Sequence, residues 1–338
     1  MAQISPPPLP AFEVRLTAPD LSPWLAGNTG IPGFTTRAAA RPGPHVAVLA
    51  LAHGNEIAGA IVLDRLLRAG LAPTRGRLTF GFVNIAAFER FDPRHPTQSR
   101  FVDEDINRVW DTAVLDGPRH SLELARAREI RPLIDTVDVA LDLHSMLWPS
   151  DALMLCGETA KGRALALGIG VPELVVADHG HVGGKRLIDY ARFADPATPY
   201  VANLVEAGQH WQDATVDTAL ASVAGLLRHL DMAPDHAVLP DLPRRPQRFA
   251  EVTMAVTAAT SGFGFVQSWR GGDIIARRNT LIALDGSTEI RAPHDDCLLV
   301  MPSLRPSRGH TAVRLARFLA APATESPAGA VRPEPARG

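Results

Sequence analysis

Two ionisable side chains follow an almost continuous apolar stretch in the first part of the sequence. Residues 44–53 read PHVAVLALAH, and His53 is followed by Gly54, Asn55 and Glu56. Imidazole and carboxylate groups are both zinc ligands, and a spacing of three residues lets the two side chains converge on one ion in a tight turn. Taken alone, the pair supports a second interpretation almost as well, in which Asn55 caps a following helix and Glu56 interacts favourably with the helix dipole.

Two further apolar stretches also end in ionisable side chains. His144 lies near the end of ALDLHS (140–145), and Glu206 lies near the end of YVANLVEAG (200–208). Parallel α/β sheets place their sites beyond the carboxyl ends of strands, so His144 is expected to complete a His–Glu–His metal set. Asp142, on the same strand face, is expected to accept a hydrogen bond from the imidazole. Glu206 could take a proton from a metal-bound water and return it to a leaving amine. The alternatives are a histidine beside a core strand and a strand-end glutamate in solvent.

A long polar segment between these stretches carries the candidate arginines. Residues 88–110 are too polar for a core and too long for a plain connector, and such loops are often functional. Arg100 and Arg108 flank three acidic residues, and a guanidinium binds carboxylates and stabilises a developing oxyanion. Asn107 and Arg108 stand between apolar residues, which predicts that they point inward. The acidic residues could instead pair with the arginines on a solvated surface, where such pairs contribute little.

Alternating strands and helices must position these residues. We expect strands at 44–53, 76–84, 137–145, 151–157, 173–178 and 200–208, and helices at 57–70, 121–136, 158–168 and 213–230. This alternation predicts an α/β catalytic domain over residues 1–233. After a proline-rich hinge, short strands broken by Gly, Pro and Asp predict a small all-β domain over 245–320. The Pro- and Ala-rich tail, 321–338, is expected to be disordered.

Composition excludes several classes of protein. The chain has 338 residues, of which 46% are hydrophobic and 21% charged, and its formal net charge is -2. No bulk positive field would attract nucleic acid or an anionic membrane, and no apolar run approaches the roughly 20 residues of a membrane span. The N-terminus lacks the basic and apolar regions of a secretory signal. The two cysteines cannot build a disulfide framework, so we expect a cytoplasmic protein.

With these residues assembled, the sequence resembles the succinylglutamate desuccinylase/aspartoacylase family, whose members are relatives of the zinc carboxypeptidases. The matching motifs are HGNE (53–56), RFVDEDINR (100–108), DLH (142–144) and VEAG (205–208), in the family's order. The resemblance covers roughly residues 44–230, and the trailing β segment is similar to the family's C-terminal domain. It implies a zinc-carboxypeptidase-like fold, with a mixed, mostly parallel sheet flanked by helices and a small C-terminal all-β domain.

The resemblance also implies an activity and a set of roles. The reaction would be hydrolysis of a small N-acyl amino acid that carries a carboxylate, giving the amino acid and a carboxylic acid. One Zn²⁺ per chain would be held by three side chains, with a water in the open position. The implied roles are zinc ligation by His53, Glu56 and His144, general base catalysis by Glu206, polarisation of the scissile carbonyl by Arg100, and binding of a substrate carboxylate by Asn107 and Arg108.

The sequence departs from the aspartoacylase pattern in the residues that hold the second carboxylate of aspartate. The family's C-terminal tyrosine is missing, since the tyrosines are Tyr190 and Tyr200. Arg186, Arg192 or neither takes the role of the arginine that precedes the general base. The loop after His144 contains Trp148, and its apolar residues either face the pocket, where they would favour a more apolar acyl or side-chain group, or pack in the core.

Two other functions fit the same residues. A metallocarboxypeptidase acting on peptides would share the metal set, although the C-terminal β domain could restrict access and favour small substrates. A protein that binds a metal or a carboxylate without turnover is the second alternative, and the presence of Glu206 argues against it. The C-terminal β domain could also make subunit contacts in a homo-oligomer.

Overall fold

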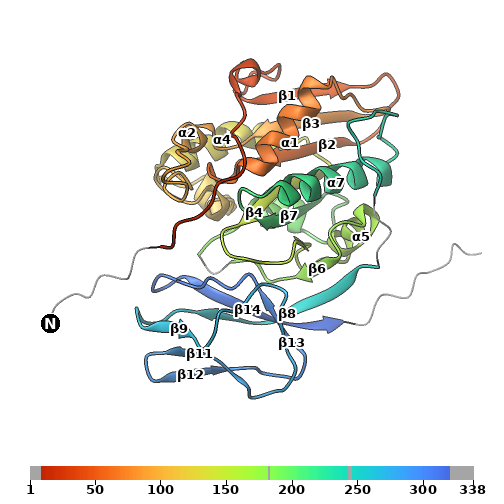
Figure 1. Cartoon of the computed structure of the whole chain (residues 1–338). Helices are drawn as coiled ribbons and strands as arrows, with labels where there is room; N and C mark the ends of the chain where they lie inside the picture. The colour runs from red at the N-terminus through yellow and green to blue at the C-terminus, as the bar shows by residue number, and fades with distance from the viewer. Residues whose placement is uncertain (1–8, 182, 243–245, 320–338) are drawn as a thin grey trace, which may run out of the picture.

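One mixed sheet of eleven strands runs through the computed structural model, which describes residues 9–181, 183–242 and 246–319 (Figure 1). In spatial order the strands are β1 (Phe34–Ala38), β3 (Arg77–Phe82), β2 (His45–Ala50), β4 (Val139–Met146), β7 (Val201–Gln209), β5 (Leu153–Leu155), β6 (Leu174–Ala177), β8 (Arg248–Thr257), β14 (Thr311–Leu319), β13 (Cys297–Val300) and β10 (Ile274–Ile275). Strands β3, β2, β4 and β7 are parallel neighbours. The α/β arrangement predicted from the alternating pattern and the mixed sheet implied by the resemblance are therefore confirmed.

Helices cover both faces of the N-terminal part of this sheet. The helices are α1 (Ile57–Arg68), α2 (Ile85–Phe88), α3 (Thr112–Leu115), α4 (Leu122–Ile134), α5 (Ala160–Ile169), α6 (Ala191–Ala194) and α7 (Asp213–His229), with 3-10 turns η1 (Ser22–Trp24), η2 (Ile106–Arg108) and η3 (Leu187–Asp189). The apolar sides of α1, α5 and α7 pack into one core, and that of α4 packs into the other. None of these helices is long and apolar enough to cross a membrane.

The alternation of side chains along β4 explains how a buried strand delivers polar groups to one place. Successive residues of a strand point to opposite faces of the sheet. Leu141 and Leu143 belong to the core under α1, α5 and α7, whereas Ala140 packs in the core under α4. Asp142 and His144 share the alternation of Ala140 and therefore project from the α4 face, at the carboxyl end of the strand.

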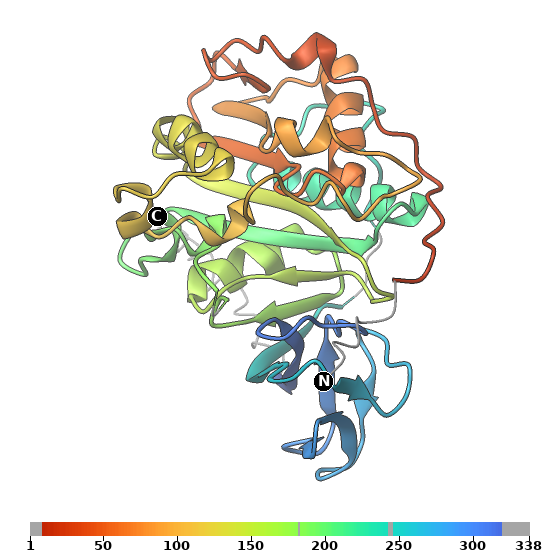
Figure 2. The same ribbon diagram turned by 90° about the vertical axis from the view of Figure 1, so that its left-hand side faces the viewer.

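The C-terminal residues extend the sheet and add a second, smaller one. Strand β8 pairs in parallel with β6 and antiparallel with β14. A three-stranded antiparallel sheet is formed by β12 (Thr288–Arg291), β11 (Leu281–Asp285) and β9 (Phe263–Phe265), which lie at the end of the molecule away from β1 (Figures 1 and 2). The predicted small β structure is confirmed, while the domain boundaries at 233 and 245 stay a prediction. The tail 321–338 lies outside the described residues.

Candidate metal centre and active site

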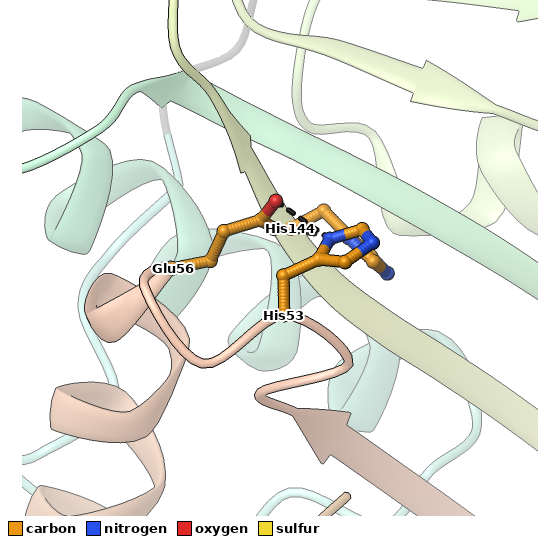
Figure 3. A group of neighbouring side chains, drawn as sticks. All are labelled: His53, Glu56 and His144. Carbon is orange, nitrogen blue, oxygen red and sulfur yellow. Dashed lines mark hydrogen bonds and ion pairs between the residues drawn. The ribbon is translucent and has the colours of Figure 1, made fainter. Parts of the chain in front are cut away.

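Three buried ligand groups converge at the carboxyl ends of β2 and β4. His53 lies in the turn after β2, Glu56 directly precedes α1, and His144 lies on β4 (Figure 3). Their ligating atoms all lie within 4.8 Å of one another. The Nδ1 atom of His53 is 2.7 Å from Glu56 Oε1, and the Nδ1 atom of His144 is 3.0 Å from Glu56 Oε2. Two imidazole nitrogens and a carboxylate facing one point form a donor set that suits zinc.

The helix-cap interpretation of this turn does not describe the structure. Glu56 occupies the N-cap position of α1, but its side chain makes no capping hydrogen bond. Its carboxylate instead accepts a hydrogen bond from the backbone N–H of Ser145 at 3.0 Å. Asn55 Oδ1 is buried and has no hydrogen-bond partner among the described residues. The Glu56 carboxylate is therefore directed to the two histidines.

Close backbone packing fixes the position of the turn. A Cβ atom on Gly54 would lie 2.3 Å from the carbonyl carbon of Ala87 and 2.4 Å from the nitrogen of Phe88. The backbone N–H of Gly54 donates to the carbonyl of Arg100 at 3.1 Å. Leu51, just before the turn, has a φ of 62°, a conformation that is costly for a residue with a branched side chain. Glycine at position 54 thus permits the close approach that ties the ligand turn to α2 and to the Arg100 loop.

Each of the two histidines contacts a second carboxylate through its Nε2 atom. His144 Nε2 is 2.9 Å from Asp142 Oδ2, which agrees with the hydrogen bond expected from their spacing. His53 Nε2 is 2.9 Å from Asp105 Oδ1, a contact between residues 52 positions apart. Carboxylates in this position fix the tautomer and the ring orientation of ligand histidines. With both Nε2 atoms facing carboxylates, both Nδ1 atoms are left to face the shared centre.

The pKa values of Glu56 and His144 depend on their charged neighbours. Burial lowers the pKa of His144, but Asp142 and Glu56 outweigh burial and hold this pKa well above its ordinary value. Burial raises the pKa of Glu56, yet His53 and His144 outweigh it and hold this pKa well below its ordinary value. Opposite charges therefore stabilise one another within a centre that excludes most of the solvent.

Glu206 lies next to this centre, where a large cavity opens. On β7 it is the register partner of His144 on β4. Burial and the neighbouring Glu56 raise the pKa of Glu206 to about 7, and its Oε2 atom has no hydrogen-bond partner among the described residues. His53, Glu56 and Glu206 line a cavity of about 850 Å³. A carboxylate at the wall of a cavity is placed to exchange a proton with a bound molecule.

Arg100 lies over the ligands and also faces the cavity. Its guanidinium donates to Glu56 Oε1 at 3.3 Å and to Asp105 Oδ2 at 3.2 Å. The side chain keeps 39% of its surface exposed and lines the cavity. Within the charge run of this loop, Asp105 is therefore not a solvated surface group, because it contacts both His53 and Arg100, whereas Asp103 is exposed.

The structure brings Asn107 and Arg108 to the same region, as the apolar residues around them predict. Asn107 is buried, its Nδ2 lies 3.3 Å from His144 Nε2, and its Oδ1 accepts from the backbone N–H of Leu187 at 2.8 Å. Burial lowers the pKa of Arg108 to about 10, and the nearest carboxylate, that of Asp105, is 3.6 Å away. The Arg108 guanidinium is thus a largely buried cation with incomplete neutralisation, which is a favourable arrangement for binding an anion.

The two arginines that precede Glu206 have structural partners. Arg186 is buried and donates two hydrogen bonds to Asp178, at 2.8 and 2.9 Å, and two to Asp189, at 2.7 and 3.0 Å. Arg192 donates to the carbonyl of Val137 at 2.7 Å and stacks on the ring of Tyr200. Both guanidiniums are already engaged by the protein in this structure.

Sequence reasoning missed His210 and did not identify Asp105 as the partner of His53. His210 is buried, lines the cavity, and has its Nδ1 2.7 Å from the Ser145 hydroxyl. Burial lowers the pKa of His210 to about 4, so the imidazole is neutral at pH 7. The signal for His210 was its place just beyond the apolar strand that carries Glu206. Asp105 offered no comparable signal, since its contact with His53 joins two distant segments.

Fold and site together define an α/β protein with a buried His–Glu–His metal-ligating set at the strand ends. Residues 42–164 match the sequence model described as the succinylglutamate desuccinylase/aspartoacylase catalytic domain, a range that contains all three ligand residues. Over this segment the chain is similar to the catalytic domain of the succinylglutamate desuccinylase/aspartoacylase family. An aspartoacylase from Xenopus tropicalis is 30% identical over 123 residues, which are 33% of this chain and 37% of that protein. The match therefore spans little more than a third of the length of this relative.

Solved structures share the fold over most of their length. Succinylglutamate desuccinylase from Vibrio cholerae is 17% identical, with a TM-score of 0.61 over 82% of each chain. A succinylglutamate desuccinylase/aspartoacylase from Rhodobacter sphaeroides is 16% identical, with a TM-score of 0.63 over 85% of this chain and 89% of that one. The product-bound ectoine utilization protein EutE (DoeB) from Ruegeria pomeroyi is 17% identical, with a TM-score of 0.61 over 84% and 88%. At these identities the likeness concerns the fold.

Proposed function

We propose that the protein is a zinc-dependent deacylase that hydrolyses the amide bond of an N-acyl amino acid, giving an amino acid and a carboxylic acid. The observation that carries this proposal is the buried His53–Glu56–His144 set with Glu206 beside it at the wall of one cavity. A family relative is named aspartoacylase, and several similar structures are named succinylglutamate desuccinylases. Both names describe removal of an acyl group from an amino acid.

The ligand set fits one Zn²⁺ per chain. Both Nδ1 atoms face the Glu56 carboxylate, and both Nε2 atoms contact carboxylates that orient the rings. Zinc held there would act as a Lewis acid and lower the pKa of a coordinated water toward about 7. Three protein ligands leave a position open for substrate and water, as catalytic zinc sites require.

Glu206 and two arginines complete the proposed site. The Glu206 carboxylate, at the wall of the cavity, would accept the proton of the attacking water and then donate it to the departing amine nitrogen. Arg100, which faces the cavity, would donate to the oxygen of the scissile carbonyl as negative charge develops there. Arg108, with Asn107 beside it, would bind the carboxylate of the substrate through its incompletely neutralised guanidinium.

The C-terminal residues favour a small substrate over a peptide chain. The loop between β13 and β14, from Met301 to His310, contributes much of the cavity wall. Because this loop lines the same cavity as His53, Glu56 and Glu206, it would restrict the space in which a long peptide could continue. We therefore favour deacylation over the carboxypeptidase reaction that the same ligands support.

The test is a conservative substitution of the base. Glu206→Gln keeps the shape of the side chain but cannot accept the proton, so we expect full zinc content and a loss of about 10²- to 10⁴-fold in kcat. Glu289→Gln, on the exposed strand β12, is the matched control and should keep wild-type kcat. Turnover near the wild-type value in Glu206→Gln would exclude Glu206 as the base.

The substrate panel separates the alternatives. N-acyl amino acids and short peptides are compared by kcat/KM with the wild-type zinc protein. Higher values for N-acyl amino acids support the proposal, and higher values for peptides identify a carboxypeptidase. Stoichiometric zinc without hydrolysis of any member would indicate a binding protein without turnover.

A further inference from the structure

The cavity beside the ligand set is much larger than a small acyl group requires. Its volume is about 850 Å³, whereas one water molecule occupies roughly 30 Å³ of liquid. Pockets that enclose drug-sized molecules fall between about 300 and 1,000 Å³. An acetyl group bound at the metal end would leave most of this space to water.

Apolar side chains from both parts of the fold also line this cavity. Leu147 and Trp148 follow β4 directly, Phe263 comes from β9, and Met301 and Leu304 follow β13. These five side chains are only partly buried, and of them Met301 and Phe263 also pack against hydrophobic cores. Apolar surface that lines a recess gains free energy when a ligand removes it from water.

The part of the wall that carries Trp148 is held in place. The Trp148 ring meets Phe12 edge to face at 5.6 Å between centroids, and Phe12 meets Trp211 in the same way at 5.9 Å. Trp211 Nε1 donates to the carbonyl of Asn55 at 2.9 Å, within the ligand turn. The carbonyl of Leu147 accepts from Gln209 Nε2 at 3.3 Å. A wall anchored at these points cannot collapse onto the metal end and fill the space itself.

Polar side chains line the same cavity as the apolar ones. His53, Glu56, Arg100 and Glu206 line the metal end. The exposed lining residues include Arg308, in the loop before β14. A substrate whose amide lies beside His53, Glu56 and Glu206 would therefore occupy a cavity whose wall also carries apolar side chains.

We propose that this cavity selects an N-acyl amino acid that carries a bulky apolar group, either as the acyl chain or as the amino-acid side chain. The inference rests on the proposed function and narrows its substrate class. The two sources share one chemistry, which is apolar surface placed against the wall formed by Leu147, Trp148, Phe263, Met301 and Leu304.

Two series of substrates distinguish the sources. The first is N-acetyl-, N-butanoyl-, N-hexanoyl- and N-octanoylglycine, and the second is N-acetylglycine, N-acetylalanine, N-acetylleucine and N-acetylphenylalanine. With the wild-type zinc protein we expect kcat/KM to rise along one series by about fourfold for each methylene that the wall buries. Values that are flat along both series, or highest for N-acetylglycine, would overturn the inference while leaving the deacylase proposal intact.

Variants of the wall test the assignment of residues. Leu304→Ala and Trp148→Ala should each reduce the preference for the long member of the favoured series by about tenfold or more, with less change for N-acetylglycine. Leu304 is included because Trp148→Ala also removes the contact with Phe12. Leu167→Ala, on the exposed side of α5, is the matched control and should keep the wild-type preference. An unchanged preference in both wall variants would contradict the assignment.

Binding to Glu206→Gln provides a readout that does not depend on turnover. Calorimetric titration of N-hexanoylglycine, N-acetylphenylalanine and N-acetylglycine should show tighter binding, and a negative heat-capacity change, for one of the apolar ligands. This result supports the inference even if no compound is hydrolysed, in which case the deacylase proposal alone fails. Equal affinities for the three ligands would overturn the inference.

Discussion

Replacing Arg186 with methionine should destabilise the protein by about 3–5 kcal/mol, because the arginine neutralises two carboxylates. One of these carboxylates is that of Asp178, which is 1% exposed. It accepts two hydrogen bonds from the Arg186 guanidinium, at 2.8 and 2.9 Å. Methionine fills a similar volume but leaves the buried Asp178 carboxylate without the two hydrogen bonds that Arg186 donates. The nearest remaining cation is Arg314, at 3.7 Å from Asp178, and its attraction should bring the loss toward the lower end of this range.

Urea unfolding followed by fluorescence and circular dichroism measures the effect. The two probes should report the same midpoint, so that the change in midpoint at constant m gives the loss of free energy. Removing the orphaned charge as well, in Asp178→Asn/Arg186→Met, should restore part of the stability lost in Arg186→Met alone. Arg291→Met breaks the exposed pair with Glu289 and should leave the midpoint unchanged.

The result bears directly on function. If Arg186 were instead a substrate-binding residue, Arg186→Met would raise KM and leave the free energy of unfolding close to that of the wild type. A loss below about 1 kcal/mol would therefore refute the reasoning that assigns Arg186 to the buried ion pairs.

Two further predictions concern the geometry of the ligand turn and the support of His53. Gly54→Ala should lower the free energy of unfolding by about 1–3 kcal/mol and weaken zinc binding, because the added methyl group overlaps the backbone of α2. The matched control is Gly264→Ala, where a Cβ atom meets nothing within 4 Å. This control should leave both the free energy of unfolding and the zinc affinity close to the wild-type values. Wild-type zinc affinity in Gly54→Ala would show that the close approach is dispensable. Asp105→Asn should lower zinc affinity by about 10- to 100-fold in a competition titration. The reason is that a neutral amide replaces the charged carboxylate that accepts the hydrogen bond of His53 Nε2. An unchanged affinity would remove Asp105 from the metal centre.

Most of the elements that position the site follow from the sequence. Strands β2, β4 and β7 are nearly uninterrupted apolar runs, and α1 ends just before Gly70, which has a φ of 70° as a helix-terminating glycine requires. The individual strand β14 was not identified within the predicted all-β segment. The Arg314 side chain is buried and Arg317 is exposed, a difference that is fixed by the pairing of β14 with β8 and β13.

The candidate ligands could be predicted because each lies at the end of an apolar strand. Of the supporting groups, Asp142 could be predicted in the same way, but Asp105 and Arg186 could not. Asp105 reaches His53 across a turn of the long loop, and its partner is decided by the tertiary fold. Arg186 fits either a substrate or a structural role in sequence, and the choice depends on the positions of Asp178 and Asp189. Asn107 was expected to contact substrate, and that role stays a prediction beside its observed contacts with His144 and Leu187.

The central claim is that His53, Glu56 and His144 hold one catalytic zinc ion. Its most direct test is zinc titration of the chelator-stripped wild-type protein, followed by competition with a chromophoric chelator and by deacylase activity in the same samples. We predict that one zinc per chain binds and that activity returns in proportion to the zinc bound, whereas His144→Ala binds zinc far more weakly. Absence of stoichiometric zinc, with activity indifferent to the chelator, would contradict the claim.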